Sequence, residues 1–461
     1  MPLLAAFIVP HPPLIVPAVG KGEEQKIKKT IDSYLEVARR IERMKPETIV
    51  LISPHAILYA DYFHVSPGAG AEGDLSHFRA PGERYAVKYD QALAAAISAA
   101  AGREGIPAGG LGEKNRRLDH GTMVPLHFVN RHYQDCELVR VSVSGLSPLV
   151  HYRFGKCLAE AIENSGKRVV LIASGDLSHK LKSDGPYGFA SEGPAFDKEV
   201  TDAMASAEFG RFLQFDEDFC EAAGECGLRS FTIMAGALDG CQVRSELLSY
   251  EGPFGVGYAV AAYDILGPDP ARRFDLVHER KERERLAASK AHEDAHVKLA
   301  RETLEQYVLH HRRIIRPTGL PADLTDVKAG VFVSLKLDGR LRGCIGTISA
   351  TTACVADEII QNAVSAGTRD PRFDPVRADE LPRLVYSVDV LGAAEPVASK
   401  TQLDPQKYGV IVRKGTRSGL LLPHLEGINT VEEQLSIALQ KGGIDPDDAY
   451  AIERFEVVRH H

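Results

Sequence analysis

Four histidines in the first half of the chain follow strand-like runs or lie in turn-like segments: His11, His55, His120 and His179. A carboxylate, Glu251, stands at the end of another strand-like run. Neutral imidazoles and carboxylates are ligands of catalytic divalent ions, and two histidines with one carboxylate leave open positions that suit non-haem Fe(II). The residue types and their spacing therefore predict a metal centre.

The placement of these histidines matters more than their number, because the chain has 17 histidines in all. His11 and His55 both follow or precede proline in a turn, which makes a ligand rigid. Glu246 lies close to Glu251 in the sequence and competes with it as the carboxylate ligand. The remaining histidines of this half are expected to be surface or packed residues: His64, His77, His127, His132 and His151.

Strands and helices that alternate along the first part must position these side chains. Apolar runs predict buried strands at 3–9, 48–52, 138–143 and 168–173, and a three- and four-residue apolar spacing predicts a helix through 27–41. Further helices are expected at 92–101, 149–162, 192–205 and 230–238, and further strands at 243–250 and 256–265. The fold class is α/β, a central sheet flanked by helices, with ligands at the carboxyl ends of the strands.

A domain boundary is expected after the first 268 residues. A chain of 461 residues is too long for one core, and Gly267-Pro268-Asp269-Pro270 is followed by a charge-dense run at 279–285. We assign a first domain to 1–268, a linker to 269–283 and an α+β second domain to 284–461. The second domain is expected to open with a helix over 284–310, followed by a hairpin that turns at Asp338-Gly339.

Composition and charge exclude several classes of protein. The net charge of -8 argues against nucleic acid as a partner, and no apolar run is long enough to span a membrane. Seven cysteines without a C-x-x-C pair indicate a reducing cytoplasm, and the first apolar run is expected to be a strand rather than a signal peptide. We therefore expect a cytoplasmic protein; a homo-oligomer is compatible with the sequence.

The first domain resembles the class III extradiol ring-cleavage dioxygenases of the LigB type, whose superfamily includes the Memo-like proteins. The resemblance rests on four ordered motifs: Pro10-His11-Pro12, Ser53-Pro54-His55, Asp119-His120-Gly121 and Gly175-Asp176-Leu177-Ser178-His179. It implies metal ligation by His11, His55 and Glu251, with Fe(II) as the cofactor and Zn, Mn or Cu as other divalent choices. It further implies that His179 is the acid/base histidine and that His120 contacts substrate or oxygen.

Asp176 and Asp119 are candidates for fixing the tautomers of nearby histidines. For Asp176, helix capping or turn formation is an equally good interpretation. The chain has no tryptophan, so Tyr59, Tyr187 and Phe254 are the aromatic residues that we consider for substrate stacking.

The resemblance leaves two functions open. The first is an extradiol dioxygenase that uses O2 to open a catechol-like aromatic substrate, as in the catabolism of aromatic compounds. The second is a Memo-like metal-binding or redox adaptor without oxygenase activity, because Gly255-Val256-Gly257-Tyr258-Ala259-Val260 is closer to the Memo-like branch.

The second domain resembles the AMMECR1 family. The motifs are Leu341-Arg342-Gly343-Cys344-Ile345-Gly346, Arg369-Asp370-Pro371-Arg372-Phe373-Asp374-Pro375 and Gly419-Leu420-Leu421-Leu422-Pro423. Arg342 and Cys344 are either a reactive or anion-binding pair or a structural ion-pair former beside a small buried residue. The fusion resembles the AmmeMemoRadiSam system, which implies a radical S-adenosylmethionine (radical SAM) protein as a partner.

Overall fold

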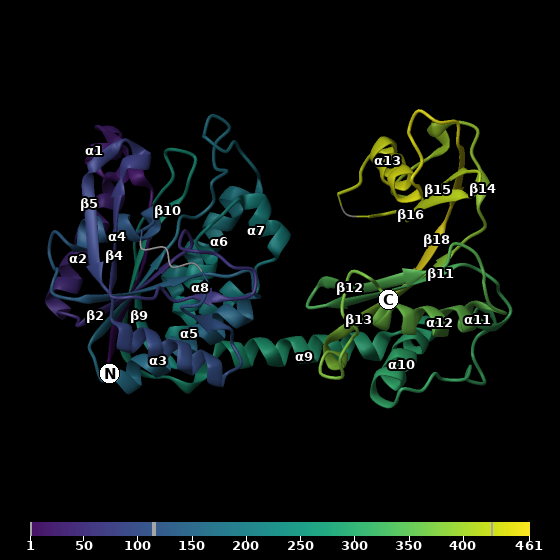
Figure 1. Cartoon of the computed structure of the whole chain (residues 1–461), viewed down its shortest axis with the longest axis horizontal. Helices are drawn as coiled ribbons and strands as arrows, with labels where there is room; N and C mark the ends of the chain where they lie inside the picture. Colours follow the sequence, from purple (N-terminus) through teal and green to yellow (C-terminus); the bar gives the residue numbers. More distant parts are fainter. Residues whose placement is uncertain (1, 113–116, 426) are drawn as a thin grey trace. The chain divides into compact units, whose positions relative to one another are not determined.

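The computed structural model describes residues 2–112, 117–425 and 427–461. The chain forms two compact units, Met1–Arg280 and Lys281–His461, hereafter the first and the second unit. In Figure 1 the first unit runs from purple to teal and the second from green to yellow. Helix α9 (Phe274–His292) contains the point of division.

A mixed six-stranded sheet is the centre of the first unit, in the order β7-β2-β8-β1-β10-β9. The four strands with parallel neighbours are β1 (Leu3–Val9), β2 (Thr48–Ser53), β7 (Glu137–Ser142) and β8 (Val169–Ser174). The antiparallel edge consists of β10 (Tyr258–Pro268) and β9 (Cys241–Glu251). All residues of β2 and β8 are buried, as expected where helices cover both faces of a sheet. The predicted α/β class is confirmed.

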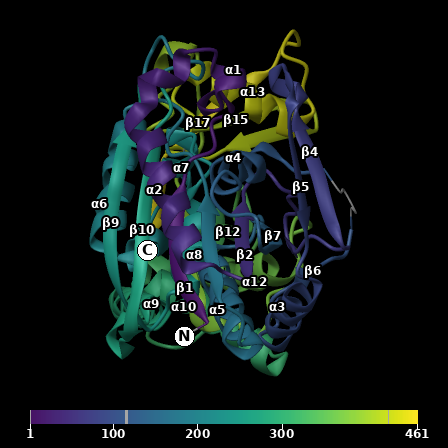
Figure 2. The same ribbon diagram turned by 90° about the vertical axis from the view of Figure 1, so that its left-hand side faces the viewer.

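Helices cover the two faces with separate apolar cores. On one face lie α2 (Lys28–Met44) and α4 (His120–Val129); on the other lie α3 (Gln91–Arg103), α5 (Pro148–Ser165), α6 (Glu192–Ser206) and α8 (Leu228–Ala237). Figure 2 shows α2 in front of the strands β9 and β10 that it contacts. The helical spacing through 27–41 predicted α2, and its apolar stripe is buried on this face.

Helices α5 and α8 pack at backbone contact. A Cβ atom added to Gly155 in α5 would lie 2.0 Å from the carbonyl oxygen of Ile233, and one added to Gly236 in α8 would lie 1.8 Å from that of Tyr152. No side chain fits at either position. The two glycines therefore set how closely these helices approach.

A β-hairpin beside the sheet was not predicted. Its strands are β4 (Gly70–Leu75) and β5 (Ala80–Lys88), joined by a short 3-10 turn over Ser76–Phe78. Only some of its residues are buried, and the glycines in β4 and the proline in β5 weaken the sequence signal for a strand. The hairpin matters because it walls a cavity next to the histidines.

Two four-stranded antiparallel sheets form the second unit, which confirms the α+β class. The first has the order β12-β11-β13-β18, namely β12 (Arg340–Gly346), β11 (Val331–Leu337), β13 (Leu384–Leu391) and β18 (Val457–His460). The second has the order β14-β17-β15-β16, namely β14 (Glu395–Pro396), β17 (Ala451–Phe455), β15 (Gly409–Lys414) and β16 (Arg417–Leu421). The predicted hairpin joins β11 and β12, and Asp338 and Gly339 both have positive φ, 52° and 84°.

The helices of the second unit differ in one respect from the sequence prediction. In place of one helix over 284–310 there are two, α9 and α10 (Ala295–His310). The break lies at Asp294, whose carboxylate accepts hydrogen bonds from the backbone N–H groups of His296 and Val297 and so starts a new helix. Helices α10, α12 (Val355–Thr368) and α13 (Val431–Gly442) pack against the sheets.

Candidate metal centre

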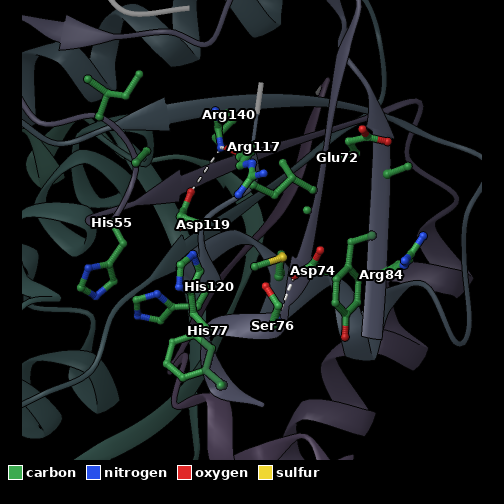
Figure 3. Close-up of a pocket in the computed structure, with 18 residues that line it drawn as sticks. His55, Glu72, Asp74, Ser76, His77, Arg84, Arg117, Asp119, His120 and Arg140 are labelled. Carbon is green, nitrogen blue, oxygen red and sulfur yellow. Dashed lines mark hydrogen bonds and ion pairs between the residues drawn. The ribbon is translucent and has the colours of Figure 1, made fainter. Parts of the chain in front are cut away.

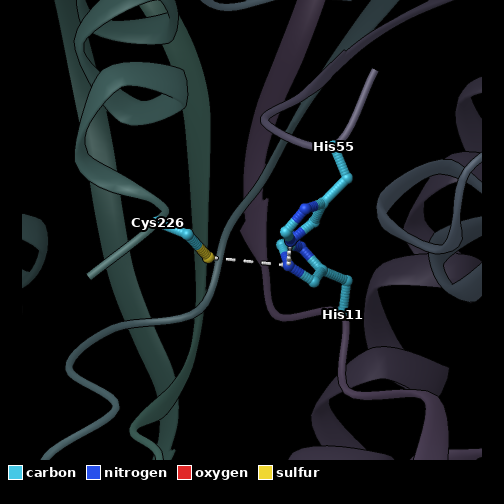
Figure 4. Close-up of side chains that lie close together, drawn as sticks. All are labelled: His11, His55 and Cys226. Atoms are coloured by element: carbon cyan, nitrogen blue, oxygen red, sulfur yellow. Dashed lines mark hydrogen bonds between the residues drawn. The ribbon is translucent and has the colours of Figure 1, made fainter. Parts of the chain in front are cut away.

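Three metal-ligating side chains converge at one edge of the first unit: His11, His55 and Cys226. The Nε2 atoms of the two histidines are 3.0 Å apart, and Cys226 Sγ lies 3.6 Å from Nε2 of His11 (Figure 4). These spacings match ligands on a single ion, because Zn–N bonds of about 2.0 Å and Zn–S bonds of about 2.3 Å place neighbouring ligand atoms roughly 3 to 4 Å apart. The donor set thus fits a transition-metal ion.

The fold brings the three ligands together from distant parts of the chain. His11 follows β1 and His55 follows β2; both strands pair in parallel with β8, so their carboxyl ends share an edge. Cys226 stands just before α8, where Gly227 packs so tightly on Gly175 that an added Cβ on Gly175 would lie 2.3 Å from the Gly227 Cα. This approach is what carries the thiol to the histidines.

Polar contacts fix both the backbone and the ring of His11. Its backbone N–H donates to Asp176 Oδ1 at 2.7 Å, and its ring Nδ1 lies 3.0 Å from Ser174 Oγ. The side chain is 1 % exposed, and burial, followed by repulsion from His55 and the other site histidines, lowers its pKa well below 6.5. A neutral ring with Nδ1 engaged presents Nε2 to an ion.

His120 and His179 lie beside the three ligands. The His120 ring centroid is 4.1 Å from that of His55, and burial lowers the His120 pKa to about 4. His179 lies 5.1 Å from the ring of Tyr187; burial and then His55 lower its pKa, and its buried Nε2 has no hydrogen-bond partner in the described part of the chain. Both imidazoles can therefore accept a proton.

The two aspartates that were candidates for fixing histidine tautomers contact backbone and hydroxyl groups instead, and Asp119 also pairs with Arg140 at 3.4 Å. Asp119 caps α4 by accepting from Thr122 N–H at 3.0 Å and from Ser53 Oγ at 2.5 Å, and Ser53 Oγ accepts from the backbone N–H of His55. Asp176 accepts from the backbone of His11, and burial raises its pKa to about 7. The residue that contacts Nδ1 of His11 is Ser174, which the sequence did not indicate.

Glu251 is not brought to the histidines, which corrects the expected ligand set. Its Oε2 accepts from the backbone N–H and the hydroxyl of Thr30, both at 2.8 Å, because the end of β9 faces the start of α2. The competing Glu246 is paired with Arg40 at 2.7 Å. The side chain that lies with the two histidines is Cys226, and no motif or periodicity in the sequence marked this cysteine as a candidate ligand.

Two cavities open at the histidines. One, of about 730 Å³, is lined by the ligands His11 and His55 and by other residues that include His120, Asp176, His179, Tyr187, Phe254 and Tyr258. The other, of about 720 Å³, shares His55, Phe78 and His120 with the first and is walled by the β4–β5 hairpin (Figure 3). Of the three aromatic residues considered for stacking, Tyr187 and Phe254 line a cavity and Tyr59 lines neither. The cluster is thus accessible to an organic molecule.

In the second unit, Arg342 and Cys344 are engaged separately. Arg342 pairs with Glu380 at 2.8 Å, whereas the backbone N–H of Cys344 donates to Asp370 Oδ2 at 2.9 Å. Burial raises the pKa of the Cys344 thiol, against a lowering by Ser334 and Arg372. Arg342 therefore acts as an ion-pair former here. The positive charge that lowers the pKa of the thiol comes from Arg372, and it is opposed by Asp389 and Asp370.

Among the described residues, no helix is both long enough and apolar enough to cross a membrane.

Comparisons with known proteins match both units. The family model described as the catalytic LigB subunit of aromatic ring-opening dioxygenase matches residues 5–261, and the AMMECR1 model matches residues 297–460. A protein of Clostridium acetobutylicum is 43% identical over 468 residues, which is 100% of this chain and 99% of the relative. A Thermotoga maritima protein is 51% identical over 170 residues, 36% of this chain and 98% of its own length.

Two solved structures are also similar to parts of the chain. A protein from Pyrococcus horikoshii has 31% sequence identity and a TM-score of 0.34, covering 36% of this chain and 88% of that one. A protein from Escherichia coli K12 has 15% identity and a TM-score of 0.39, covering 56% of this chain and 99% of that one.

Proposed function

We propose that the first unit of this chain, which belongs to the family of the catalytic LigB subunit of aromatic ring-opening dioxygenases, is a metal-dependent redox protein. An AMMECR1 domain follows this unit in the sequence. The ligands are His11, His55 and Cys226. The observation that carries this proposal is the convergence of two imidazoles and one thiol, with ligand atoms 3.0 and 3.6 Å apart.

The thiol decides which ions suit the site. A thiolate with two imidazoles favours softer ions, such as copper, iron or zinc, over magnesium or calcium. Bound copper or iron supplies one-electron chemistry at a position next to the cavities. Burial raises the pKa of the Cys226 thiol, so ion binding releases its proton.

The residues around the ligands bind substrate and move protons. His120 and His179 line the same cavity as His11 and His55, and burial lowers the pKa of both rings, so each is neutral at pH 7 and can take a proton from an acidic group of a bound molecule. Tyr187 and Phe254 give the cavity an apolar wall against which an aromatic ring can lie.

Metal analysis of variants tests the proposal. Protein purified without oxygen and loaded with Cu(I), Fe(II) or Zn(II) is expected to hold one ion in the first unit, and Cys226→Ser and His55→Ala are expected to lose it. Cys220→Ser is the matched control, because Cys220 lies in the neighbouring helix α7 (Glu217–Ala223) and is not one of the clustered ligands. Metal content that is unchanged in Cys226→Ser and His55→Ala contradicts the proposal.

A second candidate is extradiol cleavage of a catechol-like substrate with Fe(II) and O2. The two additional histidines in the cavity favour it, because a catechol must lose phenolic protons when it binds a metal. Oxygen uptake by the Fe(II)-loaded protein with a panel of catechols tests this activity. Oxygen uptake that disappears in His179→Ala while the metal is retained supports this activity. Absence of uptake with every catechol contradicts ring cleavage and leaves the first proposal, a metal-dependent redox protein, in place.

A further inference from the structure

A second group of metal-ligating side chains lies in the second unit, away from the LigB part of the chain. Asp294 caps helix α10, His296 lies in the first turn of that helix, and His460 is the last residue of strand β18. Their ligand atoms all lie within 4.8 Å of one another. Two histidines and a carboxylate, drawn from both ends of the unit, are the donor set of an open divalent site.

His460 has a hydrogen-bond partner within the cluster, whereas the ring nitrogens of His296 have none among the described residues. His460 Nδ1 contacts Asp294 Oδ2 directly. His296 has Nδ1 at 3.9 Å from Asp294 and Nε2 at 3.9 Å from Asp323, beyond hydrogen-bond range, and neither nitrogen bonds another residue in the described ranges. His296 is only 5 % exposed, so a buried ring lies between two carboxylates at ion-pair distance without a hydrogen bond to either.

The charge around the His296 ring also suits a cation. The carboxylate of Asp294 lies beside Nδ1 of the ring and that of Asp323 beside Nε2, so two acidic groups flank one buried imidazole.

Two movements of the side chains are required before they can hold an ion. The rings of His296 and His460 are stacked, with centroids 3.7 Å apart and planes 14° apart, and an ion cannot lie in the plane of both rings in that arrangement. His460 has the more exposed side chain, 16% against 6%, so its ring is the one that turns. Ligand atoms must also close from within 4.8 Å to roughly 3.4 Å, the separation set by bonds of about 2.1 Å.

We propose that Asp294, His296 and His460 bind one divalent transition-metal ion of the zinc class, joining the start of α10 to the last strand of the second unit. Asp323, on the far side of the His296 ring, orients that ring by accepting from its Nε2–H when the ion is bound. Among the described residues the cluster offers three side-chain ligands, one fewer than a tetrahedral zinc site takes, so water would complete the coordination. This site is independent of the metal centre in the first unit.

Cobalt titration of the full chain tests the site. In a His11→Ala/Cys226→Ser background, which removes two ligands of the first centre, Co(II) is expected to bind with one equivalent and to give visible d–d absorption. Adding His296→Asn abolishes this binding. His461→Asn is the matched control, since His461 is the exposed neighbour of His460 and lies outside the cluster; it retains one equivalent.

Asp294→Ser separates loss of a ligand from loss of folding, because serine also caps a helix but has no carboxylate. It is expected to lose Co(II) while its far-UV circular dichroism stays that of the parent. The proposal is overturned if the background variant binds no Co(II), or if His296→Asn or Asp294→Ser binds as much as the parent. Wild-type protein that binds only one ion, lost in His296→Asn and kept in Cys226→Ser, would support this site and contradict the first.

Discussion

The carboxylate of Asp197 is expected to make the first unit less stable as the pH rises. Asp197 lies in α6, is 1 % exposed, and accepts hydrogen bonds from the Ser178 N–H at 2.8 Å and from the Tyr250 hydroxyl at 2.7 Å. Burial raises its pKa to about 7 in spite of these two hydrogen bonds, which lower it. Replacement by asparagine keeps the shape of the side chain and removes the charge.

The magnitude follows from the difference between the folded and unfolded pKa. With a pKa of about 7 in the folded protein and 3.8 in the unfolded chain, the folded state keeps a proton that the unfolded state has lost between about pH 4 and pH 7. Stability therefore falls across this window, by about 4 kcal/mol in total at 1.36 kcal/mol for each pKa unit. Between pH 5 and pH 8.5 the loss is about 3 kcal/mol.

Urea unfolding of the metal-free protein at pH 5 and at pH 8.5 measures the effect. Far-UV circular dichroism is the appropriate signal, because the chain has no tryptophan. The free energy of unfolding of Asp197→Asn, relative to wild type, is expected to rise by about 3 kcal/mol from the lower to the higher pH. Glu199→Gln, an exposed change on the same helix, serves as the control for charge. Equal pH dependence in wild type and Asp197→Asn would refute the reasoning.

Three further changes have defined outcomes. Ser174→Ala removes the oxygen that lies 3.0 Å from His11 Nδ1, so metal affinity in a chelator competition is expected to fall by about 10- to 100-fold. Glu251→Ala leaves the Thr30 N–H and hydroxyl without their acceptor, so the free energy of unfolding is expected to fall by about 1 kcal/mol. Metal content is expected to stay at the wild-type level, and a loss of metal would restore this carboxylate as a ligand. Gly155→Ala places a Cβ 2.0 Å from a carbonyl oxygen in α8 and is expected to lower stability by at least about 1–3 kcal/mol in thermal unfolding, whereas Gly82→Ala, with no atom within 4 Å of its added Cβ, is expected to change it by less than about 1 kcal/mol.

The sequence predicted the scaffold and the histidines because both depend on local pattern. Apolar runs such as Leu3–Val9 and Thr48–Ser53 are long enough to identify buried strands, and a residue that follows such a run lies at the carboxyl edge of the sheet. His11 and His55 are therefore neighbours in space although 44 residues separate them. The resemblance to the LigB-type dioxygenases implied pocket roles for His120 and His179, and both line one cavity with His11 and His55.

The third ligand depended on packing that no local pattern encodes. Glu251 also follows a strand-like run, but its strand is antiparallel to its neighbour, and its end faces Thr30 at the start of α2. Cys226 belongs to a short connection between helices, and its position is set by the contact of Gly227 with Gly175. The break before α10 was missed for a related reason, since the charge-rich segment reads as helix on both sides of Asp294.

The position of β1 inside the sheet has a consequence for how the protein is made. This first strand pairs with β8 and β10, so Ala5 must wait for Val170 and Asp264 to be synthesised before both of its neighbours exist. At about 5–20 residues per second, the second partner appears on the order of 10–50 s after the strand leaves the ribosome. Until Val170 is synthesised this apolar strand has no neighbour, and until Asp264 is synthesised it has only one, so the sheet is completed only when nearly all of the first unit has been made.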